Sequence, residues 1–246
     1  MLIAIINQSN LNQSNYVVSD ADVATMTQAI AEQIQFDVAP IWERAPASVV
    51  FYADATAVPP GAHGIAIVPT IQDQPTGVLG IHTTDQAGQA WGAVAAQPEL
   101  ANTGQVLAGD WSVSSTLSHE VLKMFINPNC NLWADANDGK GSAYSLEVCD
   151  PVEAPTYTVN GVSVSNFVTP AWFNPLAPVG AHQFDKLGLL TAPFTILPGG
   201  YMTYQSGNKV QRQWGSAYPD WRKATKTGPW ARGQQRVTQV QAMWHT

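Results

Sequence analysis

The stretch Val113-Ser114-Ser115-Thr116-Leu117-Ser118-His119-Glu120-Val121-Leu122-Lys123-Met124-Phe125-Ile126-Asn127-Pro128 combines a helical apolar pattern with a cluster of ionisable residues. The apolar positions that share one stripe of a helix are Val113, Leu117, Val121, Met124 and Phe125. Asn127-Pro128 ends this pattern, because a residue before proline disfavours helical backbone. We therefore predict an amphipathic helix that follows Gly109-Asp110 and stops at Asn127.

The chain before this helix alternates between strand and helix patterns. Met1-Leu2-Ile3-Ala4-Ile5-Ile6 is typical of a buried strand. A helix-start signal at Ser19–Asp22 precedes apolar residues at 3.6-residue spacing, which predict an amphipathic helix up to Pro40. Three β-rich runs follow, at residues 48–53, 63–68 and 77–82. The order strand, helix and three strands indicates an α/β fold with a mixed sheet.

The chain after this helix is rich in proline and glycine and predicts short strands. Asn160-Gly161 is a strong hairpin signal, and a second hairpin is expected around Tyr201–Tyr204 and the polar turn at 206–208. We therefore divide the chain into an α/β part over 1–128, a β-rich part over 129–214, and an irregular basic extension over 215–246.

Composition limits the class of protein. The 246 residues are 45% hydrophobic and only 12% charged, which excludes a mainly disordered chain and a small disulfide scaffold. A neutral polar surface suits secreted proteins and the shells of large assemblies. We expect no membrane span and no signal peptide, because there is neither a long apolar run nor a basic segment at the start. Cys130 and Cys149 allow either one disulfide or two buried thiols.

Charge is distributed unevenly along the chain. Residues 1–185 hold 17 acidic and 3 basic residues, a net charge of −14, whereas residues 186–246 hold 1 and 8, a net charge of +7. Such a basic segment docks on nucleic acid, on another copy, or on its own acidic body. Tryptophan and arginine dominate interface hot spots. We favour docking between subunits, because the acidic body offers a ready partner for the basic segment. The residues expected to bind a partner are Trp214, Trp221, Arg222, Trp230, Arg232 and Trp244.

The predicted helix at 113–126 carries half of a zinc-peptidase signature. In that signature a histidine binds the metal, the adjacent glutamate is the general base, and a second ligand follows one turn later. Here His119 and Glu120 are present, but Lys123 stands where a further ligand is expected. Downstream, Glu147 and Asp150 are carboxylates of the kind that supply a third ligand.

The central part of the chain resembles an uncharacterised family of bacterial and phage proteins with a zincin-like, metallopeptidase-like pattern. The resemblance is carried by Ser118-His119-Glu120, Asn127-Pro128, Glu147-Val148-Cys149-Asp150-Pro151 and residues 164–173, with weaker landmarks at Pro40-Ile41-Trp42, Gly80-Ile81-His82 and Leu197–Tyr201. It covers roughly residues 1–215 and is most specific in the middle.

The resemblance implies a zincin-like fold and a peptide-binding edge strand, at 77–82 or at 91–94. It also implies His119 with Glu147 or Asp150 as zinc ligands and Glu120 as the base. The family pattern has a glutamate at the position of Lys123 and Asp-Pro at the helix end, where this chain has Asn127-Pro128.

The substitution at Lys123 has two interpretations. Its ammonium group fills the space of the missing metal and neutralises the carboxylates left behind, or the side chain extends to solvent. His82 is expected either as a further ligand or as a hydrogen-bonded structural histidine.

Three functions follow from these patterns. We favour a catalytically silent metallopeptidase-like protein that is a structural or adhesive part of an assembly, with a phage virion as the assembly suggested by the resemblance. It would need no cofactor and would reside in the virion or the bacterial cytoplasm. The first alternative is an active zinc metallopeptidase that cleaves a peptide substrate with Glu120 as base. The second is nucleic-acid binding through the basic tail.

Overall fold

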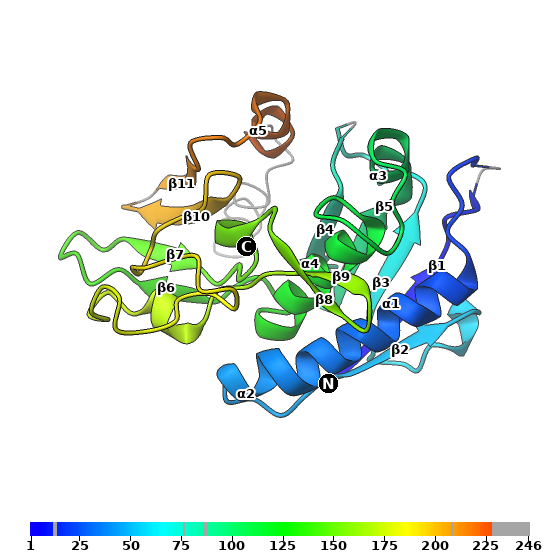
Figure 1. The fold of residues 1–246 in the computed structure, drawn as a ribbon, viewed down its shortest axis with the longest axis horizontal. Coiled ribbons are helices and arrows are strands. Elements are labelled where there is room, and N and C mark those ends of the chain that lie inside the picture. Colours follow the sequence, from blue (N-terminus) through cyan, green and yellow to red (C-terminus); the bar gives the residue numbers. More distant parts are fainter. Residues whose placement is uncertain (12–13, 76, 86–87, 208, 228–246) are drawn as a thin grey trace, which may run out of the picture.

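A computed structural model describes residues 1–11, 14–75, 77–85, 88–207 and 209–227. Its largest sheet has five strands in the order β2-β1-β3-β5-β4 (Figure 1). The strands are β1 (Leu2–Asn7), β2 (Ser48–Tyr52), β3 (His63–Val68), β4 (Gly80–Thr84) and β5 (Ala90–Ala95). The first four in that order are parallel, and β4 pairs antiparallel with β5. The expected mixed sheet is therefore confirmed, with β4 on its edge.

Two helices lie side by side against this sheet. Helix α1 (Asp20–Gln33) contacts β1 and β2, whereas α4 (Val113–Ile126) contacts β4 and β5, and the helices contact each other. The Ser19 side chain caps α1 by accepting a hydrogen bond from the Asp22 N–H, as its sequence predicts. The helical path then passes Pro40 through a π-helical turn, η2 (Ile34–Val38), and α2 (Ala39–Ile41).

The predicted stop at Pro40 is therefore wrong by one residue, for a physical reason. In the π turn the Ala39 N–H bonds to the Ile34 carbonyl, five residues back. The five-residue step changes the hydrogen-bond pattern immediately before Pro40, which has no N–H to donate.

Helix α4 is buried on nearly every side. Ser112 caps its start in a reciprocal capping box with Ser115, and it ends at Asn127 as predicted. The serines on its polar side are buried because they are hydrogen-bonded: the Ser114 hydroxyl donates to the Ser163 carbonyl, and the Ser165 N–H donates to Ser118. A helix buried all round places its ionisable residues inside the protein.

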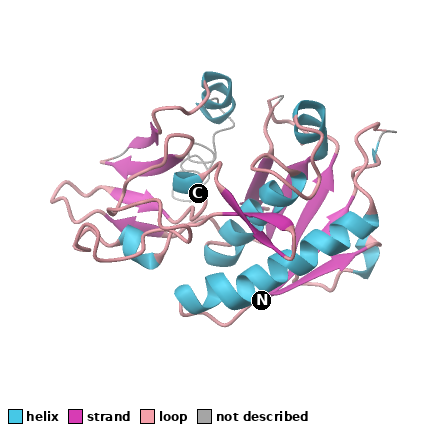
Figure 2. Cartoon of the chain, in the orientation of Figure 1, coloured by secondary structure: helices cyan, strands magenta, loops and turns pink. Residues whose placement is uncertain are grey.

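The second half of the chain forms smaller antiparallel sheets, as predicted. Strands β8 (Thr156–Val159) and β9 (Val162–Ser165) form the expected hairpin, which packs on α1 and α4. A four-stranded sheet has the order β11-β10-β7-β6. Its strands are β6 (Trp133–Asp135), β7 (Ala143–Ser145), β10 (Tyr201–Ser206) and β11 (Lys209–Trp214). A long irregular segment that includes the β8–β9 hairpin separates β7 from β10 (Figure 2), whereas β10 and β11 pair along their whole length, up to Ser206 and Lys209.

Short helices complete the described chain. They are α3 (Ala96–Asn102) and the 3-10 turns η3 (Ala55–Ala57), η4 (Asp150–Val152) and η5 (Pro170–Phe173). The expected irregular extension differs over residues 220–227, which form helix α5 (Asp220–Thr227). Trp221 and Ala224 are the only apolar residues among these eight, too few for the repeated apolar stripe that signals a helix. The proposed division at residues 128 and 214 stays a prediction.

Two further expectations concern the cysteines and the membrane. Cys130 and Cys149 are free, buried thiols, so the disulfide alternative is wrong. Within the part of the chain that the structure describes, no helix has the length and apolar character needed to cross a bilayer.

Candidate functional site

Lys123 lies at the centre of a buried polar cluster. Its side chain is only 1% exposed, and Nζ is 2.9 Å from both Glu147 Oε2 and Asp150 Oδ1. Glu120 Oε2 is 4.0 Å from the same nitrogen. The solvent-facing interpretation of Lys123 is therefore wrong, because α4 is enclosed on the side from which this residue projects.

The carboxylate pair comes from a turn that the core holds in place. Val148 and Cys149, between Glu147 and Asp150, are fully buried, and Asp150 begins the 3-10 turn η4. The Asp150 N–H donates to the Glu147 carbonyl, which turns both side chains toward α4. The sequence-predicted residues Glu147 and Asp150 thus do reach the helix.

His119 and Glu120 belong to the same cluster as Lys123. His119 Nε2 is 3.1 Å from Asp150 Oδ1, and its residue is 8% exposed. Glu120 Oε2 is 3.5 Å from His82 Nδ1, a side chain on the edge strand β4. Glu120 approaches β4 closely because residue 80 is glycine: a Cβ there would be 2.8 Å from Glu120 Cγ.

His82 links the cluster to a residue that sequence reasoning assigned no role beyond a possible disulfide, Cys130. The Cys130 Sγ is 2.9 Å from His82 Nε2, and both residues are buried. Burial disfavours the charged imidazole, but Cys130, Glu120 and Glu147 outweigh it and raise the pKa of His82 to about 9. The sequence does not predict the contact between His82 and Cys130, because 48 positions separate the two residues.

Charge within the cluster is largely balanced by the chain itself. Three carboxylates, those of Glu120, Glu147 and Asp150, face the Lys123 ammonium and the His82 imidazolium. A buried cluster of carboxylates is costly unless cations or hydrogen bonds compensate it. Lys123 supplies that compensation at the point where the two downstream carboxylates converge.

The residues present do not fit a zinc ion bound by His119, Glu147 and Asp150. The oxygens that would coordinate the metal are already at hydrogen-bonding distance from an ammonium group. His119 Nε2 is also directed at Asp150 rather than at a shared point with it. A dication at this place would be repelled by the positive charge of Lys123, and the low dielectric constant of the interior strengthens this repulsion.

A second set of potential ligands lies next to it. The ligand atoms of His82, Cys130 and Glu147 are all within 4.8 Å of one another, and these residue types bind zinc in other sites. In this structure the sulfur and the imidazole contact each other directly, and Glu147 is paired with Lys123.

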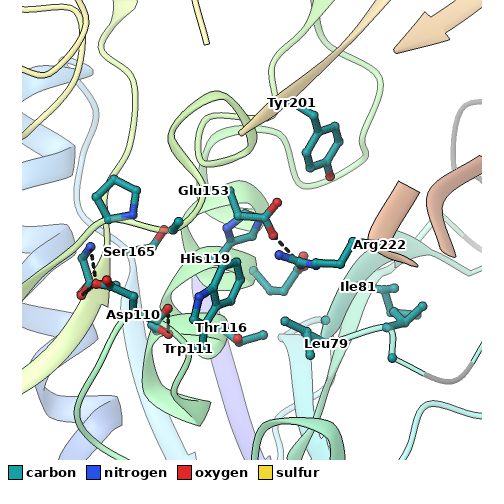
Figure 3. Close-up of a pocket in the computed structure, with 18 of the residues that line it drawn as sticks. Leu79, Ile81, Asp110, Trp111, Thr116, His119, Glu153, Ser165, Tyr201 and Arg222 are labelled. Carbon is teal, nitrogen blue, oxygen red and sulfur yellow. Dashed lines mark hydrogen bonds and ion pairs between the residues drawn. The ribbon is translucent and has the colours of Figure 1, made fainter. Parts of the chain in front are cut away.

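A cleft runs past His119 and Glu120 along the edge strand (Figure 3). Leu79, Gly80 and Ile81 line one side of it. The other lining residues include Glu153, Ser165, Tyr201 and Arg222. Of the two expected edge segments, residues 80–84 form the edge strand β4, whereas residues 91–94 lie inside the sheet between β3 and β4.

The described part of the basic extension contacts its own chain. Trp214 packs against Tyr201 and Tyr218, with ring centroids 5.5 and 4.9 Å away. Arg222 is 4% exposed and pairs with Glu153, whereas Trp221 is 56% exposed. Trp230, Arg232 and Trp244 lie outside the described residues. The partner-binding role of these residues stays a prediction.

Comparisons with known proteins found no match for this chain. No family model matches the chain, and neither a curated protein nor a solved structure matches it. The zincin-like resemblance therefore stays a prediction from the sequence motifs.

Proposed function

We propose that this chain is a catalytically silent, metallopeptidase-like protein that binds other polypeptides as a structural or adhesive part of an assembly. The observation that carries the proposal is the position of Lys123. Its buried ammonium group pairs with the two carboxylates expected as metal ligands, one helical turn after the expected ligand His119. Without a metal-bound water, Glu120 has no nucleophile to activate in the manner of a zinc peptidase.

The cleft supports a binding role that survives the loss of chemistry. Strand β4 lies at the edge of the sheet, and residues from it line the cleft beside α4. An edge strand offers main-chain groups to an added polypeptide strand. A silent site with such an edge would hold a segment without cleaving it.

Exposed apolar side chains support a place in an assembly. Leu176, Val179 and Leu189 are 76%, 74% and 50% exposed. Their loops are joined by a hydrogen bond from the Gly180 N–H to the Thr191 carbonyl. Exposed apolar side chains on adjoining loops are candidates for an interaction surface. The virion as the assembly in question rests on the resemblance described above.

Zinc binding by the full chain and its Lys123→Glu variant tests the silent site. We expect no zinc at this site in the wild type and about one zinc per chain in the variant, because the added carboxylate replaces the competing charge. Cys130→Ser is the control: it removes a ligand from the neighbouring set of His82, Cys130 and Glu147, so it shows whether any bound zinc is held there. Zinc that binds equally to the wild type, Lys123→Glu and Cys130→Ser, or peptidase activity in the wild type, would contradict the proposal.

Sedimentation velocity at increasing protein concentration tests the assembly role. We expect discrete oligomers, which weaken in a Leu176→Ser, Leu189→Ser double variant. Phe36→Ser is a matched control, because Phe36 is 67% exposed but lies in the π turn after α1. A monomer at every concentration, or equal effects of both changes, would argue against this role.

A further inference from the structure

Arg222 fills one side of the cleft as if it were a bound ligand. It comes from α5, but its guanidinium group lies among residues of the body, as Figure 3 shows beside Glu153. Nη2 is 2.7 Å from Glu153 Oε1, and both side chains are less than a tenth exposed. The carboxylate that receives it follows η4, in the same segment that supplies Glu147 and Asp150.

Aromatic rings complete the surroundings of this guanidinium. Its Cζ is 4.7 Å from the centroid of the Trp111 ring and 5.6 Å from that of Tyr218. Glu99, a second buried acid, lies close enough to feel the charge: burial raises the pKa of Glu99, and Arg222 acts against this rise. A carboxylate combined with aromatic faces selects a planar, weakly hydrated guanidinium over an ammonium group.

Arg222 is the point at which the first turn of helix α5 enters the cleft. The segment before it is anchored, since the Ala217 N–H bonds to the Pro198 carbonyl and Tyr218 is buried. Among the α5 side chains that the structure describes, residues 220–223, only Arg222 is buried. Over residues 220–223 the helix therefore buries one charged side chain and no apolar one, and a segment with few buried apolar contacts opens at a low free-energy cost.

We propose that Glu153, Trp111 and Tyr218 form a guanidinium-binding site, that Arg222 occupies it from within the chain, and that an arginine side chain of another polypeptide takes its place when α5 leaves. The ligand class follows from the contacts that Arg222 itself makes. The guanidinium-binding site consists of residues outside the Lys123 cluster. A failed test of this site would therefore leave the proposed function uncontradicted, and the reverse also holds.

Chemical rescue tests the site in the full chain. Arg222→Ala should lower the Tm by roughly 5–10 °C, because Glu153 stays buried without its cation. Methylguanidinium chloride at about 10–50 mM should restore at least half of this loss, as expected for a ligand that binds only the folded state. Methylammonium chloride at the same concentration should not.

Two further variants keep this test decisive. Lys223→Ala removes the neighbouring, partly exposed cation and should leave the Tm within about 1 °C of the wild type. Arg222→Lys keeps a cation beside Glu153 and should fold, but its Tm should still lie below that of the wild type, because an ammonium group cannot stack on the Trp111 and Tyr218 rings as a guanidinium does. This variant covers the case in which Arg222→Ala does not fold, and a Tm equal to that of the wild type would count against a site selective for guanidinium. Equal responses to both salts, or no response, would overturn the proposal.

A peptide tests the exchange with a second polypeptide. A labelled peptide that copies residues 216–227 should bind the Arg222→Ala chain, measured by fluorescence anisotropy. The same peptide with Arg222→Ala should bind at least tenfold more weakly. Adding Glu153→Gln to the receiving chain should abolish binding. Rescue by methylguanidinium without any peptide binding would show that no external arginine enters, and would overturn the exchange.

Discussion

At the residue scale, the buried ion pairs of Lys123 decide what the cluster can do. A single ammonium group serves two carboxylates at 2.9 Å, in a position that solvent hardly reaches. The sequence motif predicted which residues would meet here, but it left open whether Lys123 points inward. The answer depends on the turn at residues 147–150, which is folded over α4 from 24 or more positions away.

Lys123→Met should lower the free energy of unfolding by about 3–5 kcal/mol, because it leaves two buried carboxylates without their cation. Urea denaturation measures the change. Lys186→Met is the matched control: Lys186 also pairs with an acid, Asp37, but its side chain is 29% exposed. We expect the control to cost less than about 1 kcal/mol. Similar costs for both variants would mean that the Lys123 cluster is not a buried, paired network.

His82 should make stability depend on pH. Its pKa is about 9 in the folded chain against an ordinary value of 6.5, so the folded state binds more protons between these values. The stabilisation is complete below pH 6.5 and is lost as the pH rises through about 9, a change of about 1–3 kcal/mol. His82→Gln should flatten this decline in urea denaturation, whereas His182→Gln, at an exposed position, should not.

At the element scale, the close contact between β4 and α4 forms the cleft wall. Strand β4 supplies His82, and α4 supplies the residues that meet it. Their separation depends on Gly80, where a Cβ would lie 2.8 Å from Glu120 Cγ and 3.0 Å from Thr116 Cγ2. The hydrophobic pattern predicted both elements, but a strand pattern cannot say which strand lies on the edge.

Gly80→Ala should destabilise the chain by about 1–3 kcal/mol, because the added methyl group forces the two elements apart. Gly64→Ala on β3 is the control, since nothing lies within 4 Å of its Cβ position. We expect it to change stability by no more than about 0.5 kcal/mol. Chemical denaturation measures the free energy of unfolding of both variants. Equal changes in the two would mean that the distance between β4 and α4 adjusts freely.

At the scale of the whole molecule, both cysteines are enclosed by elements distant in sequence. Cys130 and Cys149 are 1% and 0% exposed, and burial raises the pKa of Cys149. Their nearness in sequence allowed a disulfide, but the fold directs Cys130 to His82 on the edge strand and buries Cys149 in the core. The tertiary structure therefore determines that Cys130 and Cys149 are two thiols rather than a disulfide.

A thiol reagent should consequently react with neither cysteine until the protein unfolds, and then with two per chain. The Tm should not change when a reductant is added, because no disulfide is present. Ser216→Cys provides an exposed thiol as a positive control. Rapid labelling of the native wild type would show that the enclosing elements open readily.

The sequence by itself determined the local elements: the first strand, the helices that begin near residues 20 and 113, and the hairpin at Asn160-Gly161. These signals are local, because apolar period, caps and turn residues act over a few positions. It also singled out His119, Glu120, Glu147 and Asp150 as neighbours in one site.

Only the tertiary structure decided the direction of Lys123, the contact between His82 and Cys130, and the burial of Arg222 against Glu153. Each of these depends on packing between segments that are 24 to 69 positions apart. A charged side chain enters the interior only where partners compensate its desolvation. The fold brings those partners together, so the sequence around Lys123 or Arg222 does not predict them.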